Sequence, residues 1–109
     1  MIVRLQHPDE NATPCLTVGQ EYAVIGIEAD DDRVLNDRGE PCLYPPDRFA
    51  VVAAEQPADW QKETGADGER YAYPPSLNRP GFFEDFFEGK PDAVAEFWRV
   101  VNRHLATAG

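Results

Sequence analysis

The stretch from Leu16 to Val52 constrains the fold more than any other part of this chain, because short apolar runs alternate there with tight turns. Alternating, β-branched residues predict strands, and Gly26, between two isoleucines, predicts a bulge or sharp bend in the longest one. The prolines at 45–46 cannot lie in a central strand, since they lack N–H donors. We expect a small β-barrel with strands at 2–5, 22–28, 33–35, 42–44 and 49–53.

The core of this barrel follows from the same alternation, because every second side chain of a strand faces the same side. In the strand 22–28, this rule places residues 23, 25 and 27 together and residues 22, 24 and 26 on the other face. The predicted core residues are Ala23, Ile25, Ile27, Leu43, Phe49 and Val51.

The second half of the chain changes character. A separate hairpin is predicted between Trp60 and Tyr73, with its turn at 64–68. A short helical segment with a glycine stop at Gly89 follows, and Pro91 suits the first turn of a longer helix. The apolar stripe of that helix has helical spacing and is expected to dock on the sheet. It consists of Val94, Phe97, Trp98, Val101 and Leu105.

A length of 109 residues supports one compact domain. We expect a single domain over 1–109, with the barrel at 1–54 and the hairpin and C-terminal helices at 55–109. The predicted fold class is α+β, mostly β.

The chain is strongly acidic, with 20 acidic and 10 basic residues and a formal net charge of -10. Such a field repels phosphate backbones and anionic membranes, so we expect neither nucleic acid nor a membrane as a partner. A basic protein partner fits the charge. The alternative is that the acidity only keeps the protein soluble.

Three adjacent aspartates, Asp30, Asp31 and Asp32, follow the longest predicted strand. Like charges disfavour strand pairing, so we expect a turn here. A solvated turn and an acidic recognition patch are both open interpretations. A calcium loop would need ligands that alternate with spacers and a distant glutamate, and that pattern is absent.

A second acidic cluster lies among four phenylalanines. Phe82 and Phe86, and likewise Phe83 and Phe87, are one helical turn apart, so one pair is expected in the core and the other under the hairpin or exposed. Exposed rings beside carboxylates would form an interface, whereas the carboxylates alone are also typical of a solvated helix face. The candidate partner-binding residues of this cluster are Phe83, Glu84, Asp85, Phe87 and Glu88.

No catalytic signature stands out. Cys15 and Cys42 lack metal-ligand spacing, the two histidines lie near opposite ends of the chain, and Ser76 is the only serine. We therefore expect neither enzymatic activity nor a cofactor or metal. The N-terminus has no apolar run of signal-peptide length, which favours the cytoplasm and free thiols.

The strand order from Tyr22 to Val52 resembles the SH3-like barrel, with its long strand, short hairpin, 3₁₀ turn and final strand. The segment 43–51, Leu-Tyr-Pro-Pro-Asp-Arg-Phe-Ala-Val, is similar to that family's closing pattern. The chain departs from polyproline-binding SH3 domains, because it lacks their opening Ala-Leu-Tyr-Asp-Tyr run and has Arg33 and Val34 where a tryptophan is expected. Only Tyr44, Pro46 and Phe49 could contribute to an aromatic groove.

The whole chain also resembles short bacterial proteins with an SH3-like first half, on the segment 79–87, Arg-Pro-Gly-Phe-Phe-Glu-Asp-Phe-Phe. Some small acidic proteins of this kind are immunity proteins for toxins. The resemblance implies a non-catalytic module that neutralises a basic protein partner. The alternative is an accessory or regulatory protein that binds a peptide or small ligand in the SH3-like groove.

Overall fold

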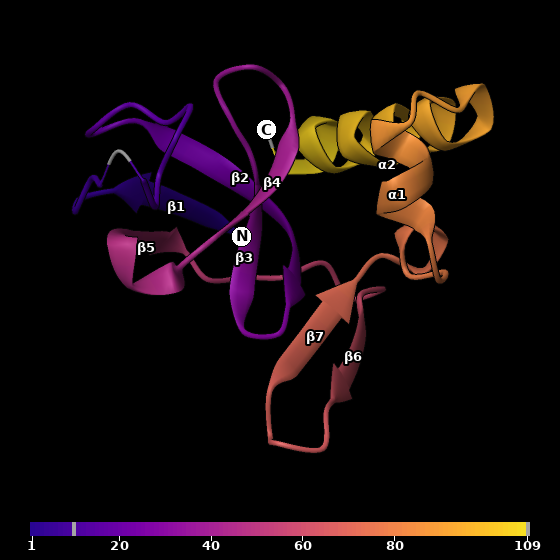
Figure 1. Cartoon of the computed structure of the whole chain (residues 1–109), viewed down its shortest axis with the longest axis horizontal. Helices are drawn as coiled ribbons and strands as arrows, with labels where there is room; N and C mark the ends of the chain where they lie inside the picture. Colours follow the sequence, from indigo (N-terminus) through magenta and orange to yellow (C-terminus); the bar gives the residue numbers. More distant parts are fainter. Residues whose placement is uncertain (10, 109) are drawn as a thin grey trace.

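The computed structural model describes residues 1–9 and 11–108, and the side chains of the last helix as far as Arg103. Its fold is α+β and mostly β, as predicted (Figure 1). The strands are β1 (Ile2–Leu5), β2 (Glu21–Glu28), β3 (Asp31–Leu35), β4 (Pro41–Tyr44), β5 (Phe49–Ala53), β6 (Gln61–Thr64) and β7 (Arg70–Tyr73). The helical elements are η1 (Pro46–Arg48), η2 (Pro75–Leu77), α1 (Phe82–Phe87) and α2 (Pro91–Ala108).

The long strand β2 organises the antiparallel sheet, whose order is β4-β3-β2-β1-β5. The first half of β2 pairs with β1, and its second half pairs with β3. The hairpin β6–β7 forms as predicted, but it is not separate, because Ile27 of β2 also pairs with Ala72 of β7. The hairpin therefore extends the sheet beside the second half of β2.

The predicted irregularity at Gly26 is confirmed, because the register between β2 and β3 shifts between Val24 and Gly26. A bulge moves the following side chains to the opposite face. Ile27 consequently packs with Val24, and Ile25 packs on the other side of the sheet. The prediction that Ile25 and Ile27 share a face was therefore wrong.

Two hydrophobic cores result, one on each side of β2. The first lies inside the curved sheet and contains Val3, Leu5, Tyr22, Val24, Ile27, Val34, Tyr44, Trp60 and Ala72. The second lies between the sheet and the helical layer, and contains Ile25, Tyr73, Leu77, Phe82, Ala93, Phe97 and Val101. Helices α1 and α2 cover the same side of the molecule (Figure 1).

The acidic turn is shorter than predicted. Only Ala29 and Asp30 form the turn, both with positive φ (49° and 70°), and β3 already begins at Asp31. The backbone N–H and the Nε of Arg70 both donate to Oδ1 of Asp30, at 3.0 Å each. This contact ties the turn to β7, so three like charges do not keep Asp31 and Asp32 out of the strand.

Four predicted core residues are not fully buried, and one of them, Phe49, is half-buried against the first core. Leu43 is 37% exposed, because it lies on the outer face of β4, and Ala23 is half-buried. Val51 is 56% exposed and its neighbour Val52 is 45% exposed. Both belong to β5, which ends the strand order and carries no charged residue.

The last helix docks through Phe97 and Val101 of the predicted stripe, and both are buried. Ala93 is buried beside them in place of Trp98, which is 36% exposed. Val94 is half-buried, and Leu105 lies outside the described side chains. Among the described residues, no helix combines the length and the apolar character needed to cross a membrane.

Truncation of Ile25 and of Val51 should separate the true core from the predicted one. Ile25→Ala is expected to lower the free energy of unfolding by about 2–5 kcal/mol, because the side chain is 4% exposed and leaves a cavity. Val51→Ala should change it by less than about 0.5 kcal/mol, since the site is on the surface. Urea unfolding measures both, and equal losses would contradict the two-core packing.

Candidate functional site

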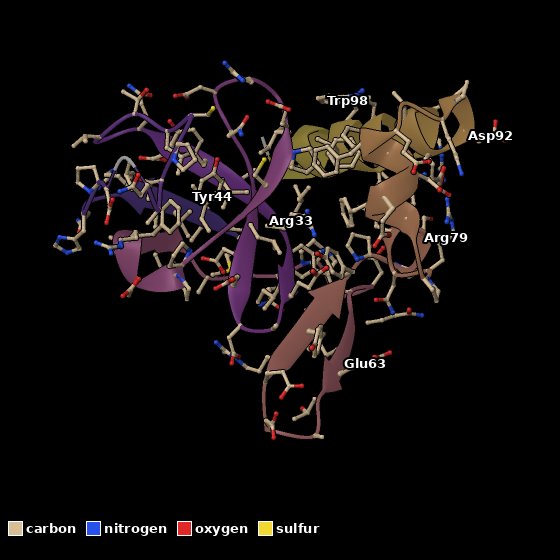
Figure 2. All side chains as sticks on the ribbon, viewed as in Figure 1. Arg33, Tyr44, Glu63, Arg79, Asp92 and Trp98 are labelled. Atoms are coloured by element: carbon tan, nitrogen blue, oxygen red, sulfur yellow. The ribbon has the colours of Figure 1, made fainter. Side chains whose placement is uncertain are left out.

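A cleft of about 360 Å³ opens between the hairpin β6–β7 and helix α1. Two of its lining residues, Glu63 on β6 and Arg79 beside α1, are labelled in Figure 2. Strand β2, the hairpin, η2 and α1 all contribute to its wall. The lining residues are Glu28, Ala29, Arg33, Glu63, Tyr71, Tyr73, Leu77, Asn78, Arg79, Pro80, Gly81, Phe82, Phe83 and Glu84.

A buried arginine lies at the inner end of this cleft. The bulge at Gly26 and the alternation of β3 turn Arg33 toward the helical layer, where it is 6% exposed. Its Nε donates to the Tyr73 hydroxyl at 2.6 Å, and Nη1 donates to the Pro41 carbonyl at 2.7 Å. Nη2 donates to Glu28 Oε1 at 3.2 Å, so all three nitrogens of the guanidinium have a partner.

Two aromatic rings also contact the same guanidinium. The Arg33 Cζ lies 3.8 Å from the centroid of the Phe83 ring and 5.9 Å from that of Tyr73. A cation over a ring face is attracted by the ring quadrupole, most strongly where water is excluded. Strand β3 and helix α1 are thus joined by a stacked contact as well as by apolar packing.

Tyr73 completes a short hydrogen-bonded chain. Its hydroxyl accepts from Arg33 and donates to Glu28 Oε1 at 3.0 Å. Burial is the largest effect on this phenol and raises its pKa. Tyr73 therefore stays neutral at physiological pH and acts as a hydrogen-bonding link. Its ring occupies space that is free only because Gly26 has no side chain, since a Cβ there would lie 2.1 Å from Tyr73 Cε1.

The charges around the cleft do not cancel. Arg33 is matched by Glu28, and Arg79 forms an ion pair of 3.0 Å with Asp85. The remaining carboxylates of the wall, Glu63 and Glu84, are exposed. The cleft therefore presents excess negative charge at its rim, next to the rings of Tyr71 and Phe83.

The structure brings only part of the predicted acidic and aromatic residues into this cleft. Phe83 and Glu84 line it, and Ala29 places the turn at Asp30 on its margin. Asp30 is engaged by Arg70, and Asp31 is half-buried in β3. The two acidic clusters thus lie at the edge of the same cleft, although most of their residues do not line it.

The other predicted residues of α1 lie outside the cleft. Asp85 is neutralised by Arg79 and by Lys90 (2.9 Å), whose hydrogen bonds hold the pKa of this carboxyl below its usual range. Glu88 lies 3.6 Å from the same lysine. Phe87 is 51% exposed, whereas Phe83 packs against the second core together with Phe82 and Phe86, so the four rings do not divide into the two predicted pairs.

Two predicted partner-binding residues are buried and cannot meet a partner at the surface. Tyr44 is 2% exposed, and its hydroxyl donates to the Pro14 carbonyl and accepts from Asn36. Asp32 is 4% exposed, within β3. Burial raises its pKa to about 6, against the opposing effect of Arg70, and Asp31 adds to the rise.

Sequence reasoning missed Arg33, Glu28 and Tyr73. One signal could have identified Arg33. It is a lone basic residue, between Asp32 and Val34, in a strand that is covered on both faces. In the described part of the chain, no three His, Cys, Asp or Glu side chains converge on a possible metal site, and both thiols are free.

Replacing Arg33 by lysine should destabilise the fold although the charge is kept. An ammonium group cannot bond to Tyr73, Pro41 and Glu28 together, and it lacks the planar stack on Phe83. We expect a loss of about 2–5 kcal/mol in the free energy of unfolding, measured by urea denaturation. Arg70→Lys is the matched control at an exposed ion pair and should have little effect. Similar losses for both variants would show that the Arg33 geometry is unimportant.

Asp32→Asn should stabilise the protein in a pH-dependent way. The folded-state pKa of about 6 lies above the unfolded value, so the wild type loses stability as pH rises from about 4 through 6. The variant has no such loss and should be more stable by about 1–3 kcal/mol at pH 7 and nearly equal at pH 4. Thermal unfolding across this range, with Asp47→Asn as the exposed control, measures the difference. A stability difference between wild type and variant that does not change with pH would contradict the raised pKa of Asp32.

Comparisons with protein-family models, with curated proteins and with solved structures find no match for this chain. The SH3-like resemblance of its first half and the immunity type therefore stay predictions. The function has to be argued from the chemistry of the cleft and of the surface around it.

Proposed function

We propose that this protein is a non-catalytic binding module whose cleft takes a basic segment of a protein partner. The observation that carries the proposal is the charge pattern of the cleft. Its two arginines, Arg33 and Arg79, are already paired with carboxylates of the same chain, while Glu63 and Glu84 at the rim face solvent. An incoming cation meets negative charge without displacing an internal ion pair.

The aromatic wall suits the same kind of side chain. Lysine and arginine have apolar stems that pack on rings while the charged head stays near water. Tyr71 and Phe83 are both half-buried in the wall, and Arg33 stacks on the ring of Phe83. Rings next to carboxylates can therefore hold the stem and the head of one basic side chain.

The long-range field supports a basic partner too. A net charge of -10 accelerates the encounter with a positively charged protein, and this effect acts mainly on the association rate. An inhibitor or immunity protein that neutralises a basic partner is the form of the proposal that this charge favours.

An oligoarginine peptide is a direct probe of the cleft. In amide NMR titrations at low salt, the largest shifts are expected at Tyr71, Tyr73 and Glu84. The double variant Glu63→Lys/Glu84→Lys should weaken binding on the order of tenfold, since it reverses the rim charge. Raising the salt from about 0.05 to about 0.5 M should weaken binding by the wild type in the same way.

The matched control changes the net charge equally at a distance from the cleft. Asp47, on η1, and Glu55, after β5, are both exposed, so Asp47→Lys/Glu55→Lys adds the same charge without altering the cleft. Equal weakening by both double variants, or shifts centred away from the cleft, would show non-specific attraction to an acidic surface and refute the proposed site.

A further inference from the structure

A second cavity, of about 320 Å³, lies on the other side of η2 from the cleft. Leu77 belongs to the wall of both. The second cavity is bounded by the chain that enters β6, by η2 and by helix α2. Its wall is mainly apolar and includes Ile25, Trp60, Val100 and Val101, together with three prolines.

This cavity is preformed, because its walls belong to packed structure. Trp60 is part of the first core, and Ile25 and Val101 are part of the second, so the cavity lies where the two cores meet. These three side chains are 6% exposed or less. The prolines at 57, 74 and 75 fix their own φ and offer no N–H, which leaves rigid apolar surface. Inward collapse would require either core to unpack.

We propose that this cavity binds a small aromatic amine, a molecule of one or two rings that carries an ammonium group. An apolar cavity of about 150 Å³ accommodates benzene, so a cavity of about 320 Å³ has room for one or two rings. It also falls at the lower end of the range of about 300–1,000 Å³ found for small-molecule sites. The proline rings and Val100, together with the largely buried Trp60, offer apolar surface against which an aromatic ring packs.

The wall contains two charged residues, Asp59 and Arg103. Asp59 is exposed and supplies a carboxylate for the ammonium group. Arg103 also lines the cavity, so the preference for a cation over an anion rests on Asp59 together with the charge of the whole chain. The net charge of -10 further favours a cation over an anion.

Phenethylamine, phenylethanol and phenylacetate form a matched set of probes, since they share one ring and differ in the charge of the end group. In a Trp98→Phe background, Trp60 is the remaining tryptophan and reports binding by its fluorescence. Phenethylamine should give a saturable change with a dissociation constant of about 1 mM, as expected for so small a ligand. Phenylethanol should bind several-fold more weakly, and phenylacetate more weakly still.

Two variants locate the site. Val100→Phe fills the cavity from α2 and should abolish the saturable change, while Ala95→Phe adds the same ring at an exposed position of that helix and should not. Asp59→Asn is a surface change that should remove the preference of phenethylamine over phenylethanol and leave phenylethanol binding intact. It keeps the test decisive even if Val100→Phe does not fold.

The absence of a saturable change for the folded wild type up to about 10 mM phenethylamine would overturn the proposal, because a site of the expected affinity is mostly filled at that concentration. Phenylacetate that binds as tightly as phenethylamine would overturn it too. So would binding that neither Asp59→Asn nor Val100→Phe changes. The proposal is independent of the acidic cleft. A cleft that binds oligoarginine beside a cavity that takes no ring would refute this inference alone.

Discussion

The guanidinium of Arg33 is the contact on which the arrangement of the layers depends. It donates hydrogen bonds to the Tyr73 hydroxyl on β7, to the Pro41 carbonyl at the start of β4 and to the Glu28 carboxylate at the end of β2. It also stacks on the ring of Phe83 in α1. A buried charge costs several kcal/mol unless its bonds are satisfied, so these partners have to stay in place together. The shape of the cleft depends on this requirement, since Glu28, Tyr73 and Phe83, which contact Arg33, also line the cleft.

The bulge at Gly26 is the second constraint, because it decides which side chains reach which core. Without it, Ile25 and Ile27 would face the same side, and the helical layer would lose the contact it makes with β2. The absence of a side chain at Gly26 also leaves the space that Tyr73 occupies. One residue thus couples the strand register to the position of the phenol that holds Arg33.

The elements of this fold could be predicted because they rest on local chemistry. Prolines, glycine turns and alternation locate the strands, the hairpin at 60–73 and the helices. The faces could not be predicted, because a single bulge reverses them, and the strand start at Asp31 depends on Arg70, which lies 40 residues from Asp30. The site divides in the same way. Phe83 and Glu84 were found from a local cluster, whereas the bond between Arg33 and Tyr73 also spans 40 residues and exists only once the chain has folded.

The uncharged strand β5 gives the acidity of this chain another role. End strands are templates on which further strands can assemble, and proteins usually protect them with proline or charge. Strand β4 begins with Pro41, and β6 carries Lys62 and Glu63, but Phe49–Ala53 has neither protection. Repulsion between copies that each carry -10 charges keeps these edges apart. Near the sequence isoelectric point of about 4.4 that repulsion is lost while the edge persists, so we expect strand-to-strand association of folded molecules to set in there.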